Sequence, residues 1–147
     1  MKKSIGRLLS ILHRQSQVYI NYALKEYDIT SAEYSFLLRL YVQDGITQDE
    51  LSCYLCIDKA ATARAIKSLE CKGYVTRDKI DDDKRVNKVY LSDKAKQCKD
   101  EVIKKVWQWS DILTEDMNEE TVEAVMTALE KMVDKVERRN FKKEKGK

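Results

Sequence analysis

The chain has 147 residues, of which 43% are hydrophobic and 36% are charged, and its formal net charge is +3. This length is typical of one domain with a sizeable core. No apolar run approaches the roughly 20 residues that span a bilayer, and the basic start lacks the cleavage site of a signal peptide. We therefore expect a cytoplasmic protein without a membrane segment, whose four cysteines are reduced thiols rather than a disulfide framework.

The first third of the sequence predicts three helices. Residues 4–26 carry apolar side chains at helical spacing, which predicts a long amphipathic helix whose broad apolar face needs a cover. A capping box at residues 30–33 predicts the start of a second helix, which Gly45 ends. A second capping box at residues 47–50 starts a short helix that reaches Tyr54.

Asp58 is a good N-cap for a helix that runs to Lys72 and is closed by Gly73. Its inward stripe is expected to consist of Thr62, Ala65, Ile66 and Leu69. The opposite face carries Ala60, Arg64, Lys67, Ser68 and Cys71, with Lys59 and Ala61 at its leading edge. Small residues ahead of cations let a helix approach a DNA groove while its charges reach phosphates or base edges. A solvated surface helix would show the same pattern, but the short capped helix before it favours a helix-turn-helix, whose second helix enters the major groove.

Two β-like runs, residues 74–79 and 86–91, follow this helix and flank a charged tip. We expect a hairpin whose inward residues are Val75, Ile80, Val86, Val89 and Leu91. The cations expected to face outward or lie at the tip are Arg77, Lys79, Lys84, Arg85 and Lys88. Residues 58–96 contain eleven basic and seven acidic side chains, so their net charge of +4 exceeds that of the whole chain. Such a local basic surface is what phosphate binding requires, and a helix followed by a charged hairpin is typical of a winged helix.

The C-terminal third predicts two further helices. Ser92 should cap a long helix that ends near Thr114. The last helix, after Asn118, has an a/d seam of Val122, Met126, Leu129, Val133 and Val136, which is expected to meet another helix, in this chain or in a partner subunit. The predicted fold class is mainly α with a small β-hairpin wing, in the order α-α-α-α-β-β-α-α. We expect one continuous unit with a winged helix-turn-helix lobe at residues 30–96 and a helical region formed by residues 1–29 and 97–147.

Four motifs within residues 50–92 resemble those of the multiple-antibiotic-resistance regulator (MarR) family of bacterial transcription factors. They are E-L-x-x-x-L at residues 50–55, D-K-x-x-x-x-R at 58–64, L-E-x-K-G-Y-V at 69–75, and D-x-R followed by V-x-L-S within 83–92. The resemblance implies a homodimer formed by the first helix and the last two. It also implies a transcriptional regulator, expected to be a repressor, that binds a pseudo-palindromic operator in double-stranded DNA. Release by a small aromatic or phenolic effector, or by an oxidant, would follow from the same resemblance.

Carried over by position, the resemblance implies a set of DNA contacts. On the recognition helix they are Lys59, Ala60, Ala61, Thr62, Arg64 and Lys67. Arg85 matches the family's wing arginine, which enters the minor groove, and Asp83 matches the acid that orients it, while Lys88 completes the expected set. Two departures matter: Cys56 stands where the family often has glycine, and alanines replace the hydroxyl residues common at positions 60 and 61. The alanines leave apolar contacts, for example to thymine methyl groups.

The cysteines and the single histidine offer rival sites. Cys53 and Cys56 form a C-x-x-C pair, but Cys71 and Cys98 complete no familiar zinc spacing and His13 is distant, so we expect no metal and no cofactor. Whether one of the four cysteines senses oxidants is left open by the sequence, because the reactivity of a thiol depends on its pKa and its exposure. His13 has no partner nucleophile and acid at a recognisable spacing, so we expect no enzyme.

Two further alternatives concern ligands and partners. The aromatic residues that could line an effector cleft are Tyr19, Tyr22, Tyr34, Tyr41, Trp107 and Trp109, although such residues at helical spacing more often form core. The second alternative is a winged-helix interaction module that does not read DNA sequence. A DNA-binding protein differs from it by losing affinity steeply as salt rises.

Overall fold

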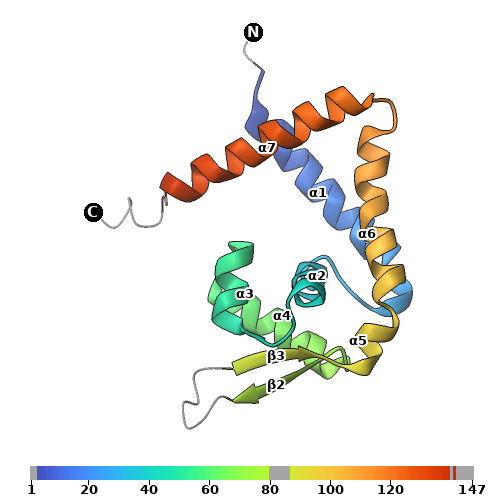
Figure 1. Ribbon diagram of the computed structural model, residues 1–147, viewed down its shortest axis with the longest axis vertical. Coiled ribbons are helices and arrows are strands. Elements are labelled where there is room, and N and C mark those ends of the chain that lie inside the picture. The colour runs from blue at the N-terminus through green and yellow to red at the C-terminus, as the bar shows by residue number, and fades with distance from the viewer. Residues whose placement is uncertain (1–2, 80–86, 140, 142–147) are drawn as a thin grey trace. The chain divides into compact units, whose positions relative to one another are not determined.

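The computed structural model describes residues 3–79, 87–139 and 141, and it is mainly helical with one small antiparallel sheet (Figure 1). In chain order the elements are α1 (Ile5–Ala23), η1 (Lys25–Tyr27), α2 (Tyr34–Val42), β1 (Ile46–Thr47), α3 (Gln48–Leu55), α4 (Lys59–Cys71), β2 (Val75–Lys79), β3 (Asn87–Leu91), α5 (Asp93–Gln97), α6 (Lys99–Thr114) and α7 (Glu119–Arg139). The predicted fold class, mainly α with a winged helix-turn-helix, is confirmed. The chain divides into two compact units, and the boundary falls between Trp109 and Ser110.

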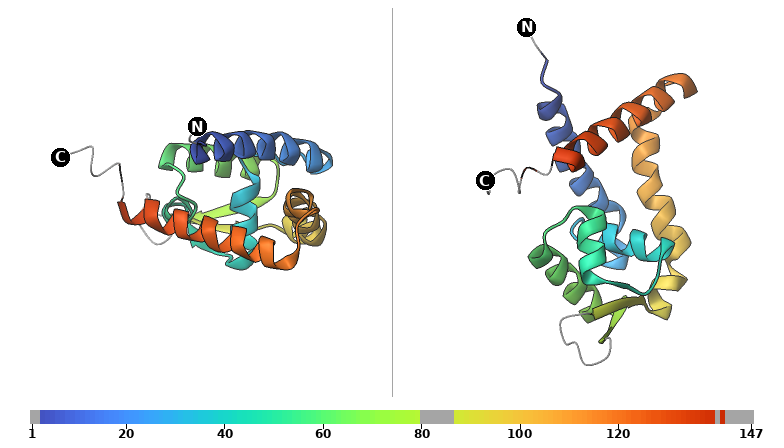
Figure 2. Two further views of the ribbon diagram at one scale, coloured as in Figure 1. Left: turned by 90° about the horizontal axis from the view of Figure 1, so that it is seen from above. Right: turned by 60° about the vertical axis from the view of Figure 1, so that its left-hand side comes forward.

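The sheet has three strands rather than the two that were predicted. β3 lies between β1 and β2 and is antiparallel to both, with Ile46 opposite Val89 and Val75 opposite Leu91. β1 contains only two residues, too few to show an alternating pattern in the sequence. The helices α2, α3 and α4 all contact the sheet, and the views in Figure 2 show the hairpin beside them.

One hydrophobic core holds the first unit together. It combines residues of the helix-turn-helix and sheet with residues of α1 and α6, including Ile20, Leu24, Phe36, Leu37, Leu40, Leu51, Ile66, Leu69, Val75, Val89 and Val102. Full burial of each such side chain stabilises the fold by about 1.5–3 kcal/mol before conformational entropy is counted. Because Ile20 and Val102 lie outside residues 30–96, the lobe shares its core with both flanking helices, and the boundaries at 30 and 96 stay a prediction.

The start of α2 differs from the predicted capping box. The helix begins at Tyr34, and residues 30–33 form a turn in which the Glu33 amide donates to the Thr30 carbonyl at 3.0 Å. The Glu33 carboxylate does reach back to the Thr30 amide, at 2.9 Å. The Thr30 hydroxyl, however, donates to the same carboxylate at 3.1 Å instead of capping an amide. The Glu33 carboxylate therefore accepts both the amide and the hydroxyl hydrogen bond of Thr30.

The long helix predicted after Ser92 is interrupted at Cys98. Ser92 caps α5 as expected, accepting from the Ala95 amide at 3.2 Å. The Tyr41 hydroxyl donates to the Ala95 carbonyl at 2.6 Å. In a continuous α-helix that carbonyl would accept from the amide of Lys99. The inserted hydroxyl therefore accounts for the division into α5 and α6.

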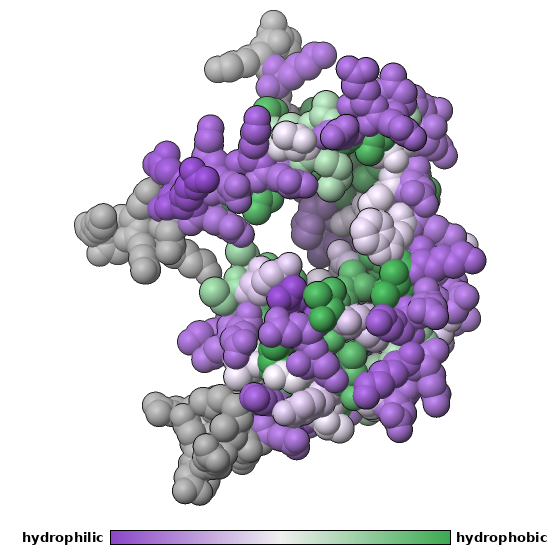
Figure 3. Space-filling view, in the orientation of Figure 1, coloured by the Kyte–Doolittle hydropathy of each residue, from purple (hydrophilic) through white to green (hydrophobic). Residues whose placement is uncertain are grey.

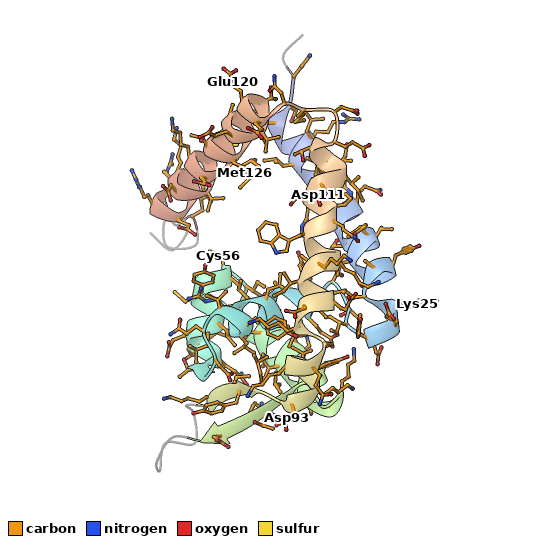
Figure 4. The ribbon with its side chains drawn as sticks, turned by 45° about the vertical axis from the view of Figure 1, so that its right-hand side comes forward. Lys25, Cys56, Asp93, Asp111, Glu120 and Met126 are labelled. Atoms are coloured by element: carbon orange, nitrogen blue, oxygen red, sulfur yellow. The ribbon has the colours of Figure 1, made fainter. Side chains whose placement is uncertain are left out.

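The predicted seam on α7 is exposed in the single chain except at Val122, which is half-buried. No described residue of α7 is buried, and Met126, labelled in Figure 4, is 52% exposed. Within the first unit, α1 likewise exposes Ile5, Leu8, Leu9 and Leu12. Figure 3 shows apolar side chains reaching the surface among hydrophilic ones. Among the described residues, no helix combines the length and apolar character needed to cross a membrane.

Candidate nucleic-acid interface

A tight turn joins α3 to α4 and sets the direction in which α4 leaves it. Cys56, at the end of α3 in Figure 4, adopts the left-handed conformation with φ 57°. The Ile57 amide donates to the Ser52 carbonyl at 3.1 Å, and the buried Ser52 hydroxyl donates to the Ile57 carbonyl. Asp58 then caps α4, accepting from the Ala61 amide at 2.7 Å. The turn is therefore held by backbone and side-chain hydrogen bonds on both sides.

The left-handed residue makes a specific prediction about stability. An L side chain in this conformation costs roughly 1–2 kcal/mol, and glycine avoids that penalty while losing more backbone entropy on folding. Cys56→Gly should therefore raise the free energy of unfolding by about 0.5–1 kcal/mol in denaturant titrations. Cys53→Gly, inside α3, is the matched control and should lower it by about 1 kcal/mol. Destabilisation by Cys56→Gly would contradict a left-handed turn at this position.

The inward face of α4 consists of the four predicted residues. Thr62, Ala65, Ile66 and Leu69 are all at most 5% exposed. The Thr62 hydroxyl donates to the Asp58 carbonyl at 2.9 Å, within the first turn of the helix. Thr62 is therefore part of the core and not of the outer surface, which corrects its place among the expected DNA contacts.

The outward face of α4 presents small and basic side chains. Ala60, Arg64, Lys67 and Cys71 are exposed and follow one another at helical spacing along one line, which we name the recognition stripe. Within the described part of the chain, the side chains of Arg64 and Lys67 form no hydrogen bond or ion pair with another residue. Lys59 is also exposed and lies 3.9 Å from Asp49, whereas Ala61 is half-buried. Of the six helix residues in the expected contact set, all except Thr62 thus reach the surface. Lys59 and Ala61 lie off the line of the recognition stripe.

Arg77 was predicted to face outward, and that prediction is wrong. It is half-buried, its Nη2 donates to Glu70 Oε1 at 2.8 Å, and its Nη1 donates to Gln48 Oε1 at 3.2 Å. The hydrogen bond from Arg77 holds the pKa of Glu70 below its ordinary value. Strand alternation predicts this orientation, because Arg77 lies two residues after the buried Val75 and so shares its face. Arg77 links β2 to the start of α3 and the end of α4.

The wing itself is described only in part. Lys88 lies half-buried on β3, opposite Thr47 and Asp78. Asp83 and Arg85 fall outside the described residues, as do the expected inward residues Ile80 and Val86. The roles of Asp83 and Arg85 therefore remain predictions.

The thiols and aromatic residues do not gather into one site. Cys53, Cys56 and Cys71 are exposed, and Cys98 is half-buried with its sulfur 3.9 Å from the Tyr41 hydroxyl. In the part of the chain that the structure describes, no three histidine, cysteine or acidic residues are placed to hold a metal ion. The Tyr19 and Trp109 rings lie 5.3 Å apart between centroids, whereas Tyr22 and Trp107 project to the surface.

A groove of about 480 Å³ lies between α1, the start of α2 and α4. Its lining includes His13 and Gln17 of α1, Tyr34 of α2, and Arg64 and Lys72 from α4 and its C-cap. Burial raises the pKa of the Tyr34 hydroxyl, which therefore stays protonated. The groove combines an aromatic side chain with basic ones and touches the helix that carries the recognition stripe.

A winged helix-turn-helix with basic residues on the outer face of its second helix defines a DNA-binding class of fold. The MarR family model matches residues 29–86. A MarR transcriptional regulator from Methanosarcina mazei is 37% identical, with 91% of this chain and 96% of that one covered and a TM-score of 0.86. The chain belongs to the MarR family, whose members are transcriptional regulators and not enzymes.

Two further proteins are similar to this chain. The HTH-type transcriptional regulator YybA of Bacillus subtilis is 30% identical over 93 residues, which are 63% of this chain and 62% of YybA. The chain thus spans less than two thirds of that relative. A MarR family regulator from Listeria monocytogenes, determined in complex with a 26mer DNA, has a TM-score of 0.88 at 23% identity, covering 99% of this chain and 97% of that one. That likeness is one of fold.

Proposed function

We propose that this protein is a sequence-specific repressor that binds a pseudo-palindromic operator as a homodimer in the cytoplasm. The observation that carries the proposal is the recognition stripe: Arg64 and Lys67 are exposed, without an ion pair to a described residue, on a helix held from behind by four buried residues. Ala60 at the front of the stripe lets the helix backbone approach base edges closely. Lys59 and Ala61 lie beside the front of the stripe on α4, Lys88 lies on β3, and Asp83 and Arg85 are assigned to the wing contact. The DNA complex of the Listeria relative supports this use of the fold.

The homodimer is proposed from the uncovered apolar faces of α1 and α7. Continuous exposed apolar faces mark contact sites in soluble proteins. A twofold axis makes two copies of α4 available to two half-sites about one DNA turn, roughly 34 Å, apart. The pseudo-palindromic operator follows from that symmetry.

Selection of bound fragments from random DNA tests the proposal. A palindromic consensus is the expected result, and its affinity should fall steeply as salt rises, because phosphate contacts release counterions. No enrichment, together with weak salt dependence, would favour the interaction module that does not read sequence.

The wing assignment has its own test. Arg85→Ala should weaken operator binding by about 1–3 kcal/mol per half-site, the range of a good groove contact, in titrations at fixed salt. Lys84→Ala removes a neighbouring cation with no assigned groove contact and should have a smaller effect. Equal affinities for wild type and Arg85→Ala, with the fold intact, would exclude the wing arginine as a groove contact.

We further propose that a small aromatic or phenolic acid occupies the groove beside α4 and releases the operator. Tyr34 offers an aromatic surface, and Arg64 offers a positive charge to a carboxylate. Titration of the operator complex with 4-hydroxybenzoate should dissociate it if the groove is the effector site. Release by an oxidant is the second candidate, because the exposed thiol of Cys71 lies in the recognition stripe itself, and peroxide treatment of the complex distinguishes the two.

A further inference from the structure

Glu33 is a charged residue in the interior of the first unit, only 2% exposed. Its Oε1 accepts hydrogen bonds from the Thr30 amide at 2.9 Å, the Thr30 hydroxyl at 3.1 Å and Lys72 Nζ at 2.8 Å. Its Oε2 accepts from the Ser68 hydroxyl. A buried carboxylate is strongly destabilising unless it is paired and hydrogen-bonded, and this one is both.

Two of these partners belong to the C-terminal end of the helix that carries the recognition stripe. Ser68 lies in the last turn of α4 and Lys72 is its C-cap residue. Lys72 Nζ donates to Glu33 at 2.8 Å and to the Asp28 carbonyl at 2.8 Å. Ser68 and Lys72 are four residues apart, so they lie one above the other on the same side of the helix axis. Together they fasten α4 to the turn between α1 and α2.

Apolar packing prevents large displacements of α4, which would open cavities in the core, but it fixes small rotations of α4 about its axis only loosely. Burial of Ala65, Ile66 and Leu69 is favourable over a range of small rotations, because the hydrophobic effect is not directional. Hydrogen bonds weaken steeply when distance and angle depart from their optimum. The two hydrogen bonds from Ser68 and Lys72, one helical turn apart and converging on one buried carboxylate, therefore restrict the rotation of α4 more narrowly than apolar packing does. The hydrogen bond from Arg77 to Glu70 adds a restraint from β2.

We propose that Glu33 is a positioning residue for DNA recognition: through Ser68 and Lys72 it fixes the rotation of α4, and with it the direction in which Arg64 and Lys67 leave the protein. The inference rests on the proposed function of the recognition stripe. Glu33 does not touch DNA, since it is buried behind the helix. Its contribution concerns selection of the operator over other DNA, because base readout depends on side-chain direction more than phosphate attraction does.

The charge state of the pair is consistent with this role. Burial by itself would raise the pKa of Glu33, but the hydrogen bonds from Lys72, Ser68 and Thr30 outweigh it and hold the pKa below its ordinary value. Glu33 is therefore ionised at neutral pH. Its contribution to stability is present above the pKa of a glutamate in the unfolded chain and is lost as pH falls through the lowered pKa of Glu33 in the folded state.

The test measures the ratio of affinities for operator and scrambled DNA in the full-length protein, at one salt concentration. Lys72→Met should lower that ratio about tenfold while affinity for scrambled DNA changes little, and Glu33→Gln should act in the same direction. The double variant should lose no more than the larger single loss, because both changes remove one interaction. Lys96→Met, which removes an exposed charge outside the groove and the stripe, is the matched control and should leave the ratio unchanged.

A merely structural role would give a different result. Loss of folded protein lowers both affinities by the same factor and leaves their ratio constant, and an unchanged ratio in folded variants would overturn the proposal. If Lys72→Met does not fold, Ser68→Ala removes only the hydrogen bond from Ser68 to Glu33. This variant should still lower the ratio of operator affinity to scrambled-DNA affinity severalfold. A wild type with no preference for any operator would refute the proposed function itself, and the positioning role with it.

Discussion

Replacement of both Met126 and Val133 by lysine should convert a dimer into a monomer of about 17.2 kDa and abolish operator binding. Both side chains are more than half exposed in the single chain and lie on the same a/d seam of α7. A lysine ammonium buried in an apolar interface without a partner costs several kcal/mol. Light scattering reports the mass, and a DNA titration reports the affinity, which should fall by at least about a thousandfold once two half-sites no longer bind as one.

The control adds the same charge to the other face of the helix. Ala124→Lys with Thr127→Lys should leave the mass and operator affinity of the wild type, since both positions are exposed and lie off the seam. A dimer that survives the Met126 and Val133 changes would show that α7 does not form the contact. Full operator affinity in a proven monomer would show that dimerisation is not needed for binding.

The second large effect is expected from Arg64→Ala. A bidentate arginine contact to a base is worth about 1–3 kcal/mol, so its removal at both half-sites should weaken operator binding by about 2–6 kcal/mol and relax base preference at one position of each half-site. Lys67→Ala should instead weaken binding to all DNA similarly, and it should reduce the salt slope by about one for each phosphate that is no longer neutralised. Selection from random DNA with each variant measures the difference.

Lys104→Ala provides the reference for both variants. It removes an exposed positive charge on α6, away from the recognition stripe, and should leave the consensus and the affinity unaltered. If Arg64→Ala selects the same consensus as the wild type, Arg64 contacts phosphate and another residue reads the bases.

Local patterns in the sequence predicted the elements that depend on neighbouring residues. The caps at Thr47, Asp58 and Ser92 and the inward stripe of α4 each involve contacts within one or two turns, and the structure has all of them. The charge of Arg77 suggested an exposed side chain, although the strand period already placed it beside Val75 on the inner face.

Features that were not predicted depend on partners distant in the sequence. The division between α5 and α6 needs the hydroxyl of Tyr41, 54 residues before Ala95. The role of Glu33 needs Lys72, 39 residues further along, and β1 exists only because β3 is there to pair with it. The direction of the stripe could be predicted from periodicity, whereas the device that fixes its rotation could not.

The shared core of the first unit limits how the DNA-reading part can move. Ile20 and Leu24 at the end of α1, and Val102 near the start of α6, pack in the same core as α2, α4 and the sheet. The winged helix-turn-helix consequently cannot slide against α1 and α6, because sliding would open cavities in the shared core that cost several kcal/mol. In the homodimer proposed above, a releasing signal is therefore expected to turn the first unit as a rigid body rather than to shift α4 within it.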